Sequence, residues 1–162
     1  MHVLRETHGP ESLLLDGARE ALIECFLHSE RIDDARAELL GMLAARGMAE
    51  IVRVTRTLGG RAETLTGLAG FGDLMSAVAG DRRPEYALGE AVAKGLSPGE
   101  AQQTVKAHVE GAKIIDDLCA YASSRRLELP LVVALGGVLR GELSGEQAVE
   151  QLMSRAVGGE GL

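Results

Sequence analysis

The chain has 162 residues, enough for one domain with a buried core, and its 46% hydrophobic and 25% charged residues are typical of globular proteins. Only 2% of the residues are aromatic, so aliphatic side chains must build the core, and stacking surfaces for single-stranded nucleic acids are scarce. The net charge of −7, with no basic run longer than two residues, argues against nucleic acids and anionic membranes as partners.

The same sequence predicts a reduced, cytoplasmic protein without a metal or a cofactor. The N-terminus lacks the basic start and apolar run of a signal peptide, and no stretch of about 18 uncharged apolar residues is present to span a membrane. Cys25 and Cys119 lie far apart without metal-ligand spacing, and both fall on apolar helix faces, where buried thiols are expected. No pair among the four histidines has metal-ligand spacing either.

The first predicted helix covers residues 11–28 and follows a flexible N-terminus of residues 1–10. Its apolar residues recur at the spacing that places them on one face of a helix. They are Leu15, Ala18, Leu22 and Cys25.

The second predicted helix covers residues 33–57 and contains Gly41 and Gly47. Because each glycine costs a helix about 1 kcal/mol relative to alanine, we expect another helix to approach closely at these positions. Arg46, Glu50 and Arg53 follow one another at i, i+4 and i+7 in this helix. Such a ladder predicts a solvated face with ion pairs.

The stretch TGLAGFGDL, residues 66–74, places Gly67, Gly70 and Gly72 ahead of Asp73. No strand precedes it and no Gly-Lys-Ser/Thr follows it, and its G-x-x-G-x-G spacing reverses the dinucleotide-binding order. The stretch is therefore not predicted to bind phosphate. We expect its glycines to let a turn and a helix pack closely and to aim Asp73 into a cleft.

The remaining helices are predicted from their start and stop signals. Pro84 suits the first turn of one helix, and another begins at Pro130 and ends at Gly141. The segments SPGE, residues 97–100, and SGEQ, residues 144–147, are capping boxes. No alternation of strands and helices is visible, so the sequence predicts one all-α domain over residues 11–157, of seven to nine helices, with residues 158–162 as a tail.

Four segments between about residues 46 and 155 carry a family resemblance. They are ARGMAEIVRVTRTLGGRAETLTGLAGFGDLM, YALGEAVAKGLSPGEA, VEGAKIIDDLCAYASSRRLELPL and GELSGEQAVEQLMSR. In order and spacing they resemble the substrate domain of bacterial NAD(P)-dependent glycerol-3-phosphate dehydrogenases. The resemblance implies a fold of the 6-phosphogluconate dehydrogenase C-terminal-domain-like type. It also implies a standalone C-terminal domain without the Rossmann domain that binds the cofactor.

The resemblance further implies that most polar site residues of the family are replaced in this chain. The family's aspartate after GLAGxG falls on Asp73, whereas its catalytic lysine falls on Glu20, or on Arg19 if the register shifts by one. The other replacements fall on Ala21, on Glu38, Leu39 and Leu40, on Ala77, and on Gly80 and Asp81. Arg82 and Arg83 directly follow the position of the family's phosphate-binding Arg-Asn pair. The expected consequence is a domain that does not reduce dihydroxyacetone phosphate.

Glu20 and Asp73 are the candidate catalytic pair. Two neighbouring carboxylates can hold one pKa raised, which suits general acid–base chemistry. Alternatively, Glu20 belongs to a solvated face of its helix, together with Asp16 and Glu24, opposite the apolar stripe.

The candidate ligand-binding residues are Arg19, Arg82, Arg83, His108 and Lys113. Arg82 and Arg83 precede a predicted helix N-terminus, and helix amides together with arginine suit an anion. His108 and Lys113 share the segment KAHVEGAK, where a base and a cation can line one pocket. The alternative for Arg82 and Arg83 is surface pairing with Asp81 or Glu85, and the alternative for His108 and Lys113 is a capping or surface role.

Three functions remain open from the sequence. The first is a small-molecule-binding or protein-assembly module, which keeps the helical core without redox chemistry and forms a homodimer or binds a partner protein through apolar helix faces. The second is a non-redox acid–base enzyme, such as an isomerase, dehydratase or cyclase of specialised biosynthesis, that uses Asp73 and Glu20. The third is the substrate half of a split dehydrogenase. The composition, rich in Ala, Gly, Leu and Arg, indicates a bacterial source.

Overall fold

The computed structural model describes residues 32–80 and 83–154, and every regular element within these ranges is a helix. The helices are α2 (Ile32–Thr57), α3 (Ala62–Thr66), α4 (Leu68–Ala79), α5 (Pro84–Ala93), α6 (Pro98–Thr104), α7 (Glu110–Arg125), α8 (Pro130–Leu139) and α9 (Gly145–Ser154). The predicted all-α class is therefore confirmed. The predicted helix over residues 11–28 and the predicted tail over residues 158–162 lie outside the described residues.

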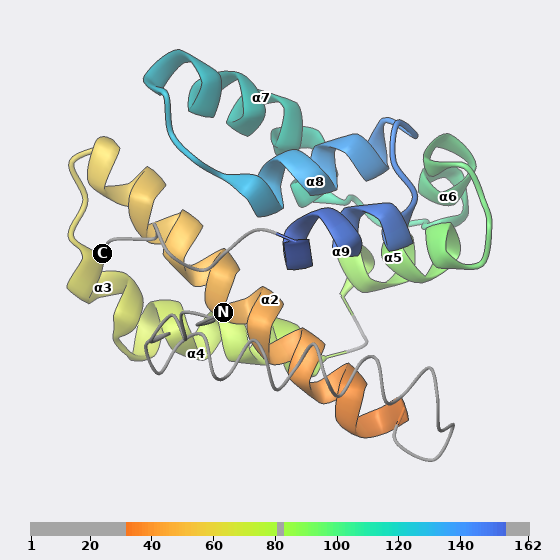
Figure 1. The fold of residues 1–162 in the computed structure, drawn as a ribbon, viewed down its shortest axis with the longest axis horizontal. Helices are drawn as coiled ribbons and strands as arrows, with labels where there is room; N and C mark the ends of the chain where they lie inside the picture. Colours follow the sequence, from red (N-terminus) through yellow and green to blue (C-terminus); the bar gives the residue numbers. More distant parts are fainter. Residues whose placement is uncertain (1–31, 81–82, 155–162) are drawn as a thin grey trace, which may run out of the picture.

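Helix α2 is the centre of the arrangement. It crosses the molecule diagonally in Figure 1, with α3 and α4 packed on one side and α8 on the other. Helix α8 also packs against α7 and α9, and α5 packs against α6 at one end of the molecule. The long helix thus connects the α3–α4 pair to the C-terminal helices.

Two aliphatic clusters lie among the buried side chains of the described residues. Leu88, Ala101 and Val109 join α5 and α6 to the start of α7. Ala134, Ala148 and Leu152 join α8 to α9, with Leu43 of α2 packed against them. No aromatic side chain is buried within the described ranges, as the composition predicts.

Both predicted capping boxes are present. The amide of Glu100 donates to Ser97 Oγ at 3.4 Å, and the amide of Ser97 donates to Glu100 Oε2 at 3.0 Å. At α9 the amide of Gln147 donates to Ser144 Oγ at 3.1 Å, and the amide of Ser144 donates to Gln147 Oε1 at 2.8 Å. The other confirmed signals are Pro84 and Pro130 in the first turns of α5 and α8, and Gly141 after α8 with a φ of +74°.

The stretch TGLAGFGDL is mostly helix rather than loop. Gly67 separates α3 from α4, so Gly70 and Gly72 both lie inside α4. A Cβ atom on Gly70 would clash with the backbone of Leu65 in α3, whereas one on Gly72 would meet no described atom within 4 Å. The expected close packing therefore depends on Gly70, where the missing side chain lets α3 and α4 meet.

Other close approaches also involve glycine. A Cβ atom on Gly47 would lie 3.4 Å from a methyl group of Leu131, which confirms the expected approach of a second helix, α8, to α2. No described atom lies within 4 Å of the corresponding position at Gly41, so the same expectation is wrong there for the described part of the chain. At Gly136 of α8 a Cβ atom would lie 3.1 Å from Cys119 Sγ of α7, and the Cys119 thiol is only partly buried rather than fully buried as expected.

Candidate functional site

Asp73 and Arg83 are the predicted site residues that the structure brings together. Asp73 lies in the middle of α4, and Arg83 is the N-cap residue of α5, directly before Pro84. Arg83 Nη2 donates to Asp73 Oδ1 at 3.0 Å, with the two side chains 45% and 72% exposed. An ion pair this exposed contributes at most about 1 kcal/mol, and it does not enclose a site for acid–base chemistry.

His108 and Lys113 lie apart from this pair. His108 is exposed in the connection between α6 and α7, and Lys113 is exposed on the first turn of α7. Within the described ranges, no hydrogen bond or ion pair links either side chain to Asp73 or Arg83. The structure therefore does not bring the four residues together.

Three predicted site residues, Glu20, Arg19 and Arg82, lie outside the described residues. The carboxylate pair of Glu20 with Asp73, and the convergence of both with Arg82, stay predictions.

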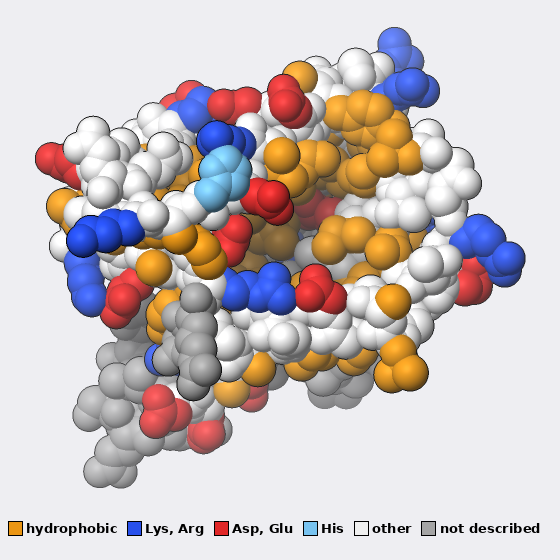
Figure 2. All heavy atoms as spheres, turned by 180° about the vertical axis from the view of Figure 1, so that it is seen from behind, with side chains coloured by type: hydrophobic (Ala, Val, Ile, Leu, Met, Phe, Trp, Pro, Cys, Tyr) orange, Lys and Arg blue, Asp and Glu red, His pale blue; other side chains and the backbone are white. Residues whose placement is uncertain are grey.

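The face opposite to the view of Figure 1 is hollowed between the helices. Figure 2 shows hydrophobic side chains and carboxylates in the hollow, with lysine or arginine side chains and further carboxylates along its rim. An apolar floor with charges of both signs around it suits a small polar molecule.

The Arg46–Glu50–Arg53 ladder is buried in part, and the prediction of a solvated face is wrong. Arg46 is 7% exposed and Glu50 is 2% exposed. The Glu50 carboxylate accepts hydrogen bonds from the amides of Leu131 at 2.6 Å and Val132 at 3.0 Å. Arg46 Nη1 donates to the carbonyl of Leu152 at 2.7 Å.

These bonds explain why the two charges are buried. The first amides of α8 and the last carbonyls of α9 have no partner within their own helices. A carboxylate at the start of a helix and a guanidinium at the end of one also match the helix dipoles. The sequence signal for this burial is the i, i+4 pair of opposite charges in α2, combined with the absence of a capping side chain before Pro130.

A second charged cluster joins α7 to the end of α8. Arg140 Nη1 donates to Asp116 Oδ1 at 2.8 Å, and Arg140 Nε and Nη2 donate to the two carboxylate oxygens of Glu142 at 2.9 and 3.0 Å. The hydrogen bonds from Arg140 lower the pKa of the Glu142 carboxyl. Hydrogen bonds to Glu142 and then to Asp116 raise the pKa of the Arg140 guanidinium. The cluster is exposed, and its bonding is satisfied by its own members, so it fits a structural role.

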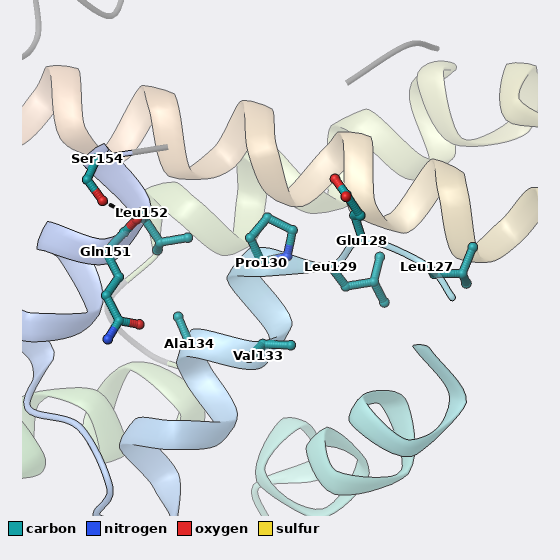
Figure 3. A pocket seen from close by; sticks show the side chains of 9 residues that line it. All are labelled: Leu127, Glu128, Leu129, Pro130, Val133, Ala134, Gln151, Leu152 and Ser154. Carbon is teal, nitrogen blue, oxygen red and sulfur yellow. Dashed lines mark hydrogen bonds between the residues drawn. The ribbon is translucent and has the colours of Figure 1, made fainter. Parts of the chain in front are cut away.

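An apolar groove lies between α8, α9 and the connection from α7 to α8, with a volume of about 410 Å³. Figure 3 shows Ser154 and Gln151 at one end and Glu128 and Leu127 at the other. Its lining consists of residues 127–130 of the connection, Val133 and Ala134 of α8, and Gln151, Leu152 and Ser154 of α9. None of the predicted site residues in the described part of the chain lines this groove.

The described residues contain neither a membrane-spanning helix nor a metal-binding cluster. None of their helices is long and apolar enough to cross a membrane. No group of three or more His, Cys, Asp or Glu side chains in the described part is placed to hold a metal ion.

The chain matches a known protein family over most of its length. The pattern of the family described as NAD-dependent glycerol-3-phosphate dehydrogenase C-terminus matches residues 33–150. The chain belongs to this family. The family membership confirms the resemblance noted in the sequence, including the helical C-terminal domain that it implied.

The similar proteins are glycerol-3-phosphate dehydrogenases [NAD(P)+]. The chain is 36% identical over 123 residues to the protein of Coxiella burnetii (strain CbuK_Q154), covering 76% of this chain and 36% of that one. It is 36% identical over 129 residues to the protein of Rhodospirillum rubrum, covering 80% and 36%, and 38% identical over 128 residues to that of Deinococcus radiodurans, covering 79% and 37%.

A solved structure agrees with these relatives. The crystal structure of the Coxiella burnetii glycerol-3-phosphate dehydrogenase matches with a TM-score of 0.66 and 30% sequence identity, covering 88% of this chain and 40% of that chain. The chain therefore spans little more than a third of the length of the curated relatives it matches.

Proposed function

We propose that this domain is an assembly module that pairs with a second copy of itself through the exposed face of α4. The observation that carries the proposal is that α4 is an apolar helix with no buried residue. Leu68, Phe71 and Met75 are 95%, 50% and 42% exposed. They stand at i, i+3 and i+7, and therefore on one face of the helix.

The charges around α4 favour a second copy as the occupant. Asp73 is the sole charged residue in the sequence of α4, and Arg83 of the same chain already pairs with it. Two α4 helices related by a two-fold axis would thus bring the same apolar stripe together without an unpaired charge. Gly72 has no described atom within 4 Å of its Cβ position, which leaves room for a close neighbour.

Sedimentation velocity over a concentration series tests the pairing. The chain should form a dimer, and Phe71→Asp should weaken it about a hundredfold because a charge replaces a central apolar contact. Ile114→Asp is the matched control, since Ile114 is 51% exposed on α7, away from α4. A chain that stays monomeric at all concentrations, or equal effects of both substitutions, would contradict the proposal.

We also propose that this chain does not act as a dehydrogenase by itself. The support is the resemblance, which aligns Glu20 with the family's catalytic lysine and Ala77 with its threonine. A carboxylate cannot polarise a carbonyl as a lysine does, and it repels a phosphorylated substrate. The purified chain should not oxidise NADH or NADPH with dihydroxyacetone phosphate, and measurable turnover would refute this proposal.

A second candidate function is the binding of a small phosphorylated molecule beside the Asp73–Arg83 ion pair, because Arg83 lies at the N-terminus of α5, where helix amides together with arginine suit an anion. NMR titration with glycerol 3-phosphate is the direct measurement, with Arg83→Gln as the variant that should weaken binding. Loss of a substrate-consuming activity in Asp73→Asn would instead favour the acid–base enzyme. Binding that is unchanged in Arg83→Gln would rule out this site.

A further inference from the structure

Arginine side chains gather at one end of the molecule, where α2 and α7 both end. Figure 1 shows the two C-terminal helix ends on the same side, and Tyr121 Oη donates to Thr57 Oγ1 at 3.1 Å between them. The surface, named the basic end, consists of Arg53 and Arg56 of α2, Arg125 of α7 and Arg126 directly after it. We propose that the basic end binds an acidic segment of a partner protein. The inference does not depend on the pairing through α4.

The first argument is the missing counter-charge. In the described part of the chain, no carboxylate forms an ion pair with these four guanidinium groups. The carboxylates nearest in the sequence have other contacts. Glu50 accepts from two amides of α8, Glu63 bonds Arg61 at 3.4 Å, and Glu128 has an interaction of its own. Four cations thus lack a carboxylate among the described residues, although the net charge of the chain is −7.

The second argument is the state of Arg53. Its Nε atom is buried and has no acceptor among the described residues. A donor of a charged group that is cut off from water without a partner is unfavourable. Arg53 lies one turn before Thr57 on the same face of α2, beside the hydrogen bond that joins the two helix ends. A carboxylate arriving there gives the guanidinium the acceptor that it lacks, once the side chain turns toward the surface.

The third argument is the placement of the two arginines of α7. The guanidinium of Arg125 lies 5.6 Å from the ring centre of Tyr121, and this stacking restricts its motion before a ligand binds. Arg126 has a φ of +54°, in the left-handed region that suits glycine at the end of a helix. The dipole of α7 favours one cation at this end, and Arg125 already provides it. A second arginine in a strained position is therefore better explained by a partner's charge.

The nature of the surface favours a protein segment as the partner. Arg56, Arg125 and Arg126 are exposed on the ends of two helices, and Leu58, which is 69% exposed, adds an apolar contact beside them. The carboxylates of aspartate and glutamate match the planar fork of a guanidinium. A nucleic acid carries phosphates along its whole length, and the remaining surface of an acidic chain repels them.

Fluorescence anisotropy with a labelled synthetic peptide tests the proposal. The peptide consists of glutamates around one central leucine, and a second peptide has glutamine in place of every glutamate. The full chain should bind the first peptide and not the second. Binding should weaken about tenfold when the ionic strength rises from about 0.01 to about 0.15 M, because salt screens the exposed charges.

Substitutions at both ends of α2 locate the site. Arg53→Gln and Arg56→Gln should each weaken peptide binding about threefold. Arg36→Gln is the matched control, because Arg36 is exposed near the start of the same helix, at the opposite end of the molecule. It removes the same charge and should leave peptide binding unchanged.

Arg126→Gly separates binding from folding. Glycine suits the left-handed backbone, so this variant should unfold at an equal or higher temperature while it binds the peptide about threefold more weakly. The proposal is overturned if the glutamate peptide does not bind, if the glutamine peptide binds equally, or if Arg36→Gln and Arg56→Gln weaken binding to the same extent. Tighter binding of a labelled single-stranded oligothymidylate than of the glutamate peptide would also overturn it, in favour of a nucleic acid.

Discussion

Glu50 acts as the helix cap of α8 although 81 residues separate it from Leu131. Burying a carboxylate is costly unless hydrogen bonds compensate it, and here two backbone amides do so. Arg46, one turn away on the same helix, bonds a carbonyl of α9 across 106 residues. The two side chains thus replace local capping groups with long-range ones.

Replacing Glu50 with alanine should lower the free energy of unfolding by about 3 kcal/mol, because the amides of Leu131 and Val132 lose their partner. Glu38→Ala, on an exposed part of the same helix, is the control and should change it by about 0.5 kcal/mol or less. Urea denaturation of both variants measures the difference. Similar values for the two would show that the bonds to α8 contribute little.

The Arg140–Glu142 contact should make stability depend on pH. The folded pKa of Glu142 is lowered, so its contribution is complete above the ordinary carboxyl pKa and is lost as the pH falls through the folded pKa. The stability difference between the parent chain and Glu142→Gln should therefore be constant from neutral pH down to about pH 4.3 and shrink below it. Thermal unfolding at a series of pH values measures it. A difference that grows on acidification would contradict the assigned cause.

Among the elements, the α3–α4 junction depends on one glycine. Gly70 meets the backbone of Leu65, while Gly72, two residues later in the same helix, has no described atom close to its Cβ position. Both glycines lower the helix propensity of α4 by the same amount, but their surroundings differ.

Gly70→Ala should destabilise the fold by about 2 kcal/mol, because the added methyl group cannot be accommodated without moving the backbone. Gly72→Ala should be neutral or stabilise the fold by up to about 1 kcal/mol through helix propensity. Chemical denaturation at a concentration below that of dimer formation compares them. Equal destabilisation by the two substitutions would refute the assigned role of Gly70.

The helices and their caps could be predicted because their signals are local. Ser97 and Glu100 lie three residues apart, and the partners of such a box are fixed as soon as the helix forms. The burial of Glu50 could not be predicted, because its partners come from a helix whose position depends on the tertiary fold. At the candidate site, the resemblance indicated Asp73, but the sequence did not show that Arg83 would pair with it at the surface.

At the scale of the whole molecule, each copy carries a net charge of −7, so two copies repel at long range. An apolar contact through α4 must form against this repulsion. Raising the ionic strength from about 0.01 to about 0.15 M should therefore tighten the dimer, since the Debye length falls from roughly 30 to roughly 8 Å. Sedimentation at both salt concentrations measures the change. Weaker association in salt would indicate a contact built on opposite charges instead.

The long-range caps have a consequence for the order of folding. During synthesis α2 leaves the ribosome well before α8 and α9. The side chains of Glu50 and Arg46 therefore remain hydrated until these two helices are available. Because their bonds close loops of 81 and 106 residues, they can form only late, when most of the domain is already in place. The two buried charges therefore favour a late folding step in which α2 becomes fixed to α8 and α9.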